Sequence, residues 1–287
     1  ANGNTYNGGW KNDTKDGQGT FIYSNGEKYV GAWKNGKMEG PGIFTFTNGN
    51  EYEGDWENDK KNGQGTFIYS NGEKYIGEWK NGKMEGHGTF NFKNGDQYEG
   101  DWKDDQAHGQ GTFRYSTGNT YVGELKKDKR DGRGTINYLN GDSYDGDWKN
   151  DHVHGEGIFT NAAGDKYEGD WKNDTKDGQG TFIYSSGERY VGAWKNGKME
   201  GPGIYNYKNG NQYDGDWKNG RKEGQGNFTT SNGEKYVGEF KDGNMDGRGT
   251  YNYANGNTYN GDWKNDTKDG QGTFIYSNGE KYVGAGK

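Results

Sequence analysis

Short stretches of the chain place aromatic residues or glycine on alternate positions with polar residues between them. In the first unit Tyr6, Gly8 and Trp10 follow this alternation, and residues 17–23 repeat it with Gly-x-Gly-x-Phe-x-Tyr. A period of two is the pattern of a β-strand with one structured face. Two such stretches follow each other within one unit of 23 residues. Each unit is therefore predicted to form a β-hairpin.

The tyrosine that opens each unit recurs with a constant spacing and no insertion. It stands at positions 6, 29, 52, 75, 98, 121, 144, 167, 190, 213, 236, 259 and 282. All 10 tryptophans lie four residues after one of these tyrosines, and Leu125, Phe240 and Gly286 take that position in the remaining units. Self-similarity of this kind indicates a tandem array. We predict one continuous array over residues 1–287, with about twelve full repeats and partial units at both ends.

Two polar segments connect the predicted strands. Residues 11–16 are expected to form a polar loop within the hairpin, and residues 24–27 (Ser-Asn-Gly-Glu) to form the turn into the next unit. The 57 glycines exclude helix. The predicted fold is all-β, a single elongated, twisted and open antiparallel sheet of tandem hairpins without helices. At about 4.8 Å per strand, twelve units would make a rod about 115 Å long.

Composition shows what must hold such a sheet together. Only 26% of residues are hydrophobic and the mean hydropathy is −1.44, values typical of disorder, but 16% are aromatic. We therefore expect the rings to replace an aliphatic core, with each indole lying over glycine backbone. The facing pairs that this predicts are Tyr6 with Phe21 and Trp10 with Gly17 within the hairpin, then Trp33 with Gly19 and Tyr29 with Tyr23 between hairpins.

The same rings are the candidate binding residues. In a single-layer sheet one side of each ring would face solvent or a partner, and an apolar strip of this length is larger than monomers usually expose. Two interpretations stand together, a structural core and a ligand-binding ladder. The residues are Tyr6, Trp10, Tyr29, Trp33, Tyr52, Trp56, Tyr75, Trp79, Tyr98, Trp102, Tyr144, Trp148, Tyr167, Trp171, Tyr190, Trp194, Tyr213, Trp217, Tyr259 and Trp263.

The motif Tyr-x-Gly-x-Trp, then Gly-x-Gly-x-Phe, then Asn-Gly, as in residues 29–49, resembles MORN repeats and covers essentially the whole chain. The resemblance implies an elongated sheet of hairpins. It also implies a scaffold role at cytoskeletal, ciliary or membrane-associated structures, sometimes as extended dimers, with lipid headgroups as a proposed ligand. The departures from the motif are expected to be local weak points. They are Leu125, Phe240 and Gly286 at the tryptophan position, and Asn161 and Thr230 at the last aromatic position.

Charge argues against a nucleic-acid partner. The net charge is −7 with a pI near 5.3. Lysine follows the tryptophan position in most units, as in Lys11 and Lys34, and an acidic residue such as Asp55 often stands two positions before it. We expect these rows to neutralise each other on a solvated face. No apolar run has the length of a membrane span or a signal peptide core.

No residue pattern supports an enzyme, a cofactor or a metal site. The chain has no cysteine, and catalytic sites need a non-repeating constellation that the array lacks. His152 and His154 form a His-x-His pair in a segment interpreted as a variable loop without carboxylate support. The 4 methionines share one loop position, where we expect them to pack over the hairpin end; they are Met38, Met84, Met199 and Met245.

These observations favour a non-catalytic scaffold or protein-interaction rod. Residues 1–32 recur as residues 254–285 with Asp262 in place of Gly9, which duplication explains and which also allows self-association through terminal edge strands. The expected partners are other proteins or copies of the chain. A phospholipid-binding adaptor and a carbohydrate-binding module are the alternatives. The resemblance suggests a cytoplasmic location at the cytoskeleton or a membrane, and the residues alone give none.

Overall fold

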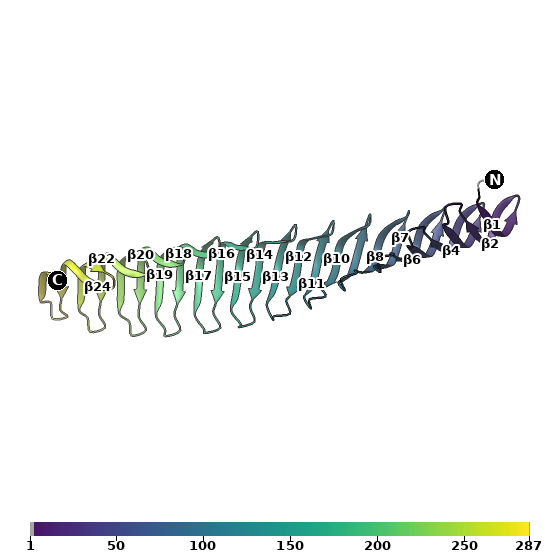
Figure 1. Cartoon of the computed structure of the whole chain (residues 1–287). Helices are drawn as coiled ribbons and strands as arrows, with labels where there is room; N and C mark the ends of the chain where they lie inside the picture. The colour runs from purple at the N-terminus through teal and green to yellow at the C-terminus, as the bar shows by residue number, and fades with distance from the viewer. Residues whose placement is uncertain (1–2, 287) are drawn as a thin grey trace. The chain divides into compact units, whose positions relative to one another are not determined.

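Every regular element of the structure is a β-strand. The computed structural model describes residues 3–286, with the backbone alone at positions 285 and 286. Its 25 strands belong to one antiparallel sheet, and no helix occurs among the described residues. Figure 1 shows the strands following one another as hairpins in chain order. The predicted all-β class and the tandem hairpins are confirmed.

The chain divides into two compact units. Unit 1 runs to Leu139 and includes Trp148–Asp151, and unit 2 comprises Asn140–Asp147 and the residues from His152 onward. The strands of unit 1 are β1 (Thr5–Lys11), β2 (Thr14–Ile22), β3 (Lys28–Lys34), β4 (Lys37–Thr45), β5 (Glu51–Glu57), β6 (Lys60–Ile68), β7 (Lys74–Lys80), β8 (Lys83–Asn91), β9 (Gln97–Lys103), β10 (Gln106–Arg114), β11 (Thr120–Lys126) and β12 (Lys129–Asn137).

Strand β13 (Ser143–Lys149) has residues in both units. The strands of unit 2 are β14 (His152–Thr160), β15 (Lys166–Lys172), β16 (Thr175–Ile183), β17 (Arg189–Lys195), β18 (Lys198–Asn206), β19 (Gln212–Lys218), β20 (Arg221–Thr229), β21 (Lys235–Lys241), β22 (Asn244–Asn252), β23 (Thr258–Lys264), β24 (Thr267–Ile275) and β25 (Lys281–Gly286). No helix of the described chain has the length and apolar character needed to span a bilayer.

The connection inside each hairpin is a tight two-residue turn. Asn12 and Asp13 have φ angles of 47° and 56°, and positive φ at both central residues defines the turn whose twist matches paired strands. Asn35 and Gly36 take the same role with φ angles of 48° and 82°. The predicted loop over residues 11–16 is therefore wrong, because Asn, Asp and Gly tolerate the left-handed conformation and strand β2 already begins at Thr14.

The predicted turn between hairpins is confirmed. The Tyr23 amide donates to the Glu27 carbonyl at 2.9 Å, and the Gly26 amide donates to the Tyr23 carbonyl at 2.9 Å. Gly26 has a φ of 94°, which favours glycine at this position. The side chain of Asn25 accepts the Glu27 amide at 3.0 Å. This arrangement recurs along both units, so the turn residues fix the start of each following strand.

In hairpins of both units, a bulge changes the register that the alternation predicted. Tyr6 faces Phe21 as expected, but Trp10 faces Lys15 because the pairing shifts after Gly8. The second strand holds two additional residues there, which a simple alternation does not reveal. Between hairpins the structure also corrects the predicted pairs, and the observed ones are Trp33 with Gly17 and Tyr29 with Phe21.

The bulge leaves backbone groups that specific side chains satisfy. In the hairpin of β5 and β6, the Tyr52 hydroxyl donates to the carbonyl of Asp55 at 3.0 Å. The Asp55 carboxylate accepts the backbone amide of Gln64, nine residues later, at 3.3 Å. Seven hairpins show this carboxylate bond, with distances between 2.6 and 3.4 Å. The acidic residue is thus an acceptor for the bulge.

Two hairpins have alanine in place of the acidic residue, and both have proline at the position of the amide that the acidic residue would accept. Ala32 is followed nine residues later by Pro41, and Ala193 by Pro202; these are the only 2 prolines in the sequence. Proline has no N–H, so a hairpin with proline at this position has no amide for a carboxylate to accept. The acidic residue and the amide therefore occur together or are absent together in these hairpins.

This relation predicts the outcome of a paired substitution. Asp55→Ala should lower the free energy of unfolding by about 1 kcal/mol, because the Gln64 amide loses its acceptor. Adding Gln64→Pro should restore most of that loss, since the double variant reproduces the Ala32 and Pro41 pair of the preceding hairpin. Urea denaturation of the three proteins measures both effects. A double variant less stable than Asp55→Ala alone would contradict the account.

Candidate interaction surfaces

One face of the sheet carries the tyrosines, the tryptophans and the second-strand aromatics, and we call it the ring face. Tyr29 lies over two glycines that face each other, Gly31 and Gly42. A methyl group added to Gly42 would come within 2.5 Å of Tyr29 Cε2, and one added to Gly31 within 2.6 Å of the Tyr29 hydroxyl. Only glycine leaves room for the ring. The tyrosine, and not the indole as predicted, fills the space above the glycines.

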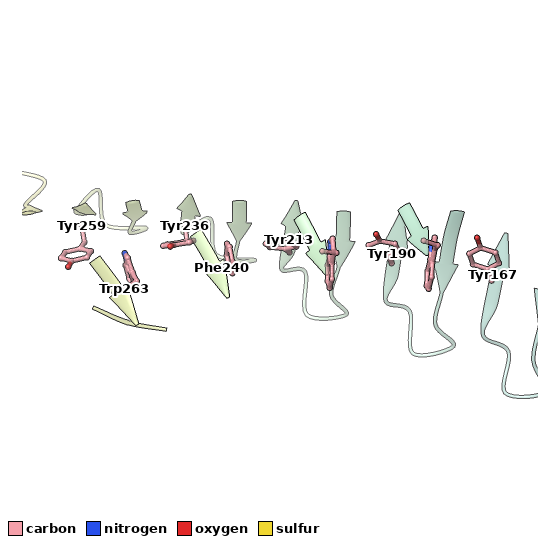
Figure 2. Packing of buried hydrophobic residues seen from close by; sticks show 9 residues of the cluster. Tyr167, Tyr190, Tyr213, Tyr236, Phe240, Tyr259 and Trp263 are labelled. Carbon is pink, nitrogen blue, oxygen red and sulfur yellow. The ribbon is translucent and has the colours of Figure 1, made fainter. Parts of the chain in front are cut away.

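A tryptophan typically stands between two tyrosines, whereas Trp10 in the first hairpin has Tyr6 as its ring neighbour. The Trp33 ring makes edge contacts with Tyr29 at 5.1 Å and with Tyr6 of the preceding hairpin at 5.6 Å between centroids. It also contacts Phe21 at 5.8 Å, and its Nε1 donates to the carbonyl of Gly19 at 3.4 Å. Figure 2 shows the same alternation of tyrosine with tryptophan or phenylalanine in unit 2. Neighbouring hairpins are therefore joined through their rings.

The rings are more deeply buried than the single-layer prediction allowed. Tyr29 and Tyr52 are 0% exposed, and Trp33 and Trp56 are 4% and 6% exposed. The prediction that one side of each ring faces solvent is wrong for these residues, because the rings of adjacent hairpins cover one another. The structure brings most of the candidate tyrosines and tryptophans of each unit together as core, whereas Trp10 is exposed and Tyr6 is only partly buried. Their role in ligand binding stays a prediction.

Leu125 and Phe240, which depart from the motif, still fill the tryptophan position. They are 6% and 3% exposed, so both are buried like the indoles they replace. At the last aromatic position, the Asn161 side chain bonds to Asp165 and the Thr230 hydroxyl to the Glu234 carbonyl. Whether these hairpins are weak points stays a prediction.

The ring face also holds cations that the sequence interpretation missed. Five residues after the tryptophan position, lysine or arginine often alternates with a residue that carries no charge, usually methionine. Lys15 Nζ lies 3.6 Å from the Trp33 ring centroid and Lys61 Nζ lies 3.7 Å from that of Trp79. Such cation–π contacts offset part of the cost of desolvating the charge. The cationic members are Lys15, Lys61, Arg130, Lys176, Lys222 and Lys268.

Burial shifts the ionisation of these lysines. Desolvation lowers the pKa of Lys61 to about 8, with the nearby Asp105 acting in the opposite direction. Desolvation lowers the pKa of Lys176 to about 8 as well. The same cause raises the pKa of Tyr236 to about 12, because its hydroxyl is enclosed by the rings. Burying a lysine on the ring face therefore costs desolvation free energy that burying a methionine does not.

The methionines occupy strands, and not a loop as predicted. Met38 faces Trp33 across β3 and β4, and Met84 faces Trp79 across β7 and β8. Both side chains are 7% exposed. They pack against the ring face beside the turn, which agrees with the expected structural role. Because the turn has only two residues, the second strand begins before the methionine, and the methionine lies in the strand.

His152 and His154 also lie in a strand, β14, so the loop interpretation is wrong. His152 Nδ1 lies 2.6 Å from Asp174 Oδ2, which supplies the carboxylate that the sequence did not suggest. His154 Nδ1 is buried without a hydrogen-bond partner. Across residues 3–286 no group of three metal-ligating side chains comes together. A histidine and one carboxylate do not make a metal centre.

The opposite face of the sheet is polar with local exceptions. The carboxylates of its acidic row accept hydrogen bonds from backbone amides at the bulges. The prediction that these carboxylates pair with the lysine row therefore left out their main partner. In unit 1 the exposed side chains of Ile22, Val30 and Ile43 lie on neighbouring strands, with Val30 directly facing Ile43. In unit 2 Ile183, Val191 and Ile204 occupy the equivalent positions. We call these two groups the aliphatic trios.

Each aliphatic trio has the same polar surroundings. Ile43 follows Pro41 by two residues and faces Glu53 on β5, and Ile204 follows Pro202 and faces Asp214 on β19. Most other hairpins place threonine where these isoleucines stand, for example Thr66. Exposed β-branched residues on a polar strand face are a signal that the sequence contained. The residues at these alternate positions vary from unit to unit, so the aromatic period alone does not single them out.

The family-model comparison agrees with this architecture. The MORN-repeat family model matches twelve consecutive segments, from residues 6–28 to residues 259–281. A comparison with curated protein sequences gives no match. The TCP10 domain of Danio rerio CPAP, solved with a peptide of Danio rerio STIL, has a TM-score of 0.42 and 12% identity, covering 78% of this chain and 96% of that chain.

Two further solved structures are more distant. The SAS-4 (dCPAP) TCP domain of Drosophila melanogaster, in complex with a proline-rich motif of Ana2, has a TM-score of 0.33 and 11% identity over 52% of this chain and 81% of that chain. Virginiamycin B lyase from Staphylococcus aureus has a TM-score of 0.15 and 13% identity over 99% of this chain and 88% of that chain. Similarity at this level assigns no function.

The repeated hairpins and their shared rows of rings define a tandem β-hairpin repeat protein. Since the matched segments run without a break from residue 6 to residue 281, the chain belongs to the MORN-repeat family.

The tryptophan position can be tested with a natural replacement. Trp102 is 7% exposed and donates to the Gly88 carbonyl at 3.1 Å. Trp102→Ala should lower the free energy of unfolding by about 3–5 kcal/mol, because a large buried ring is removed. Trp102→Leu should cost less, since Leu125 fills the same position. Denaturation that is unchanged by Trp102→Ala would show that the indole row is not structural.

The desolvated lysine predicts a pH-dependent gain from methionine. Between about pH 8 and pH 10 the unfolded chain keeps the Lys61 proton more tightly than the folded chain does. The free-energy penalty of burying this charge is therefore full below about pH 8 and decreases as the pH rises through that range. Lys61→Met should therefore raise the urea midpoint at about pH 7 and raise it less at about pH 10. The exposed neighbour Lys60→Met serves as control. An equal gain at both pH values would contradict the prediction.

Proposed function

We propose that the chain is a non-catalytic scaffold that binds other proteins through the aliphatic trios of the opposite face. The observation that carries this proposal is the repetition of the trio. Ile22, Val30 and Ile43 recur in unit 2 in the same register, while most of the ring face of each unit is closed by its own packing. Apolar groups gathered on an otherwise polar surface are typical of protein-interaction sites.

The surroundings of the trios indicate the chemistry of the partner. Glu53 and Asp214 stand directly beside the isoleucines, and the chain has a net charge of −7. A partner segment with aliphatic side chains next to lysine or arginine would complement both the apolar and the acidic positions. The acidic character also weighs against anionic lipid as the main ligand of this face. The proposal also includes self-association of the chain, which involves residues other than the aliphatic trios.

Affinity capture with the intact chain as bait tests the proposal. We expect Ile22→Thr, Ile43→Thr, Ile183→Thr and Ile204→Thr together to reduce capture of the principal partner at least tenfold, which corresponds to about 1.4 kcal/mol. Threonine already stands at these positions in other hairpins, so the fold should be retained. Far-ultraviolet circular dichroism of bait and variant checks this.

The matched control changes aliphatic residues outside the trios. Val122→Asn and Val237→Asn replace exposed valines by the residue that Asn7 and Asn260 provide at the same position. Capture should be unchanged by this control. Equal losses from the control and the trio variant, or none from either, would show that the trios are not the binding surface.

A further inference from the structure

Residue 286 takes the tryptophan position but is a glycine, and a cavity lies on the ring face of unit 2 where the indole would be. Gly286 stands where ten other hairpins place tryptophan, and it faces Gly270 on β24. The cavity has a volume of about 310 Å³. Its lining residues are Tyr259, Lys268, Gly272, Phe274, Tyr276, Tyr282 and Gly284.

This lining matches the environment of a tryptophan elsewhere in the chain. Trp33 contacts Tyr6, Tyr29 and Phe21, lies under Lys15 and donates to the Gly19 carbonyl. Adding eleven repeats of 23 residues, or 253, to these five numbers gives Tyr259, Tyr282, Phe274, Lys268 and Gly272, and all five line the cavity. The cavity therefore has the contacts of an indole site without the indole.

The occupied and vacant sites differ in how the surrounding groups lie. Tyr282 is 65% exposed, whereas Tyr29 is 0% exposed. Lys268 Nζ lies 4.9 Å from the Phe274 centroid and 4.9 Å from that of Tyr259, while Lys15 Nζ approaches the Trp33 centroid to 3.6 Å. An indole at this position would give Lys268 the ring that its counterparts have.

The chain also has an exposed tryptophan that could fill such a site. Trp10 on β1 is 62% exposed, and among the described residues β1 pairs with β2 alone. Strand β23 has the sequence of β1 except for Asp262 in place of Gly9, and it already pairs with β22 so that Trp263 faces Gly247 and donates to the Gly249 carbonyl at 3.2 Å. A strand with this sequence thus makes the required contact within the molecule.

We propose that the vacant position is a binding site for Trp10 of a second copy, with β1 of that copy replacing β25 on β24. In the established register Trp10 would face Gly270, and Tyr6 would face Phe274 in the place of Tyr282. The indole N–H would reach the Gly272 carbonyl. Strand β25 brings no ring to this position, so the exchange gains an indole and its cation–π contact. The contact is heterologous and can add further copies.

This proposal deepens the self-association part of the proposed function and uses residues apart from the aliphatic trios. Sedimentation velocity over a range of concentrations should show wild-type association. Trp10→Ala should weaken it at least tenfold, because a buried indole at an interface is typically worth more than about 1.4 kcal/mol. Gly286→Trp should weaken it similarly by filling the site from within. Circular dichroism confirms that both variants are folded.

Mixing the two variants gives the decisive result. Trp10→Ala keeps the vacant site and Gly286→Trp keeps the exposed indole, so each should be monomeric alone and the mixture should form a one-to-one dimer that grows no further. Trp10 fluorescence should shift to shorter wavelength as the dimer forms. A wild-type chain that stays monomeric at about millimolar concentration, or association that both variants leave unchanged, would overturn the proposal.

Partner capture separates this proposal from the proposed function. The Trp10→Ala and Gly286→Trp chains should capture the protein partner as well as wild type does, because neither change touches the aliphatic trios. Loss of self-association with retained capture supports the indole site. Loss of capture in these variants would contradict the assignment of two separate surfaces.

Discussion

The packing of a tyrosine ring on two facing glycines is the interaction on which the rest of the structure depends. The ring fits because Gly31 and Gly42 present no side chain, and its hydroxyl reaches the carbonyl of Ala32 at the bulge at 3.0 Å. One side chain thus fills the ring face and satisfies a backbone group. Each such ring buries something like 150–250 Å², which is how a chain poor in aliphatic residues orders its backbone.

The other regularities follow from this contact. The bulge that accommodates the hydroxyl needs an acceptor for one amide, and either a carboxylate such as Asp55 or a proline such as Pro41 resolves that need. The tryptophans then stand between successive tyrosines and couple one hairpin to the next. Because the ring face is closed by these contacts, protein binding is proposed for the polar face, where aliphatic residues are exposed. The exposed Trp10 and the cavity at Gly286 are the exceptions on the ring face.

The sequence predicted the hairpins, the turn at residues 24–27 and the Tyr6 and Phe21 pair, because a constant period fixes which positions share a face. It failed at Trp10, since alternation does not show the two extra residues of the bulge. It failed at Trp33, because β2 ends at Ile22 and Tyr23 belongs to the turn instead of facing Tyr29. The candidate rings and their structural role were predicted, but the cover on both sides of a ring such as Tyr29 was not, because cover by neighbouring hairpins depends on the register. The cations near the rings and the aliphatic trios were visible as periodic positions and became meaningful only with the pairing known.

The α-proton chemical shifts of the paired glycines test the central claim most directly. If each tyrosine ring lies over its two glycines, the α-protons of Gly31 and Gly42 should be shifted upfield by the ring current, whereas those of the turn residue Gly26 should not. The same contrast should repeat from hairpin to hairpin in isotope-labelled protein. Paired glycines with shifts like those of the turn glycines would contradict the account.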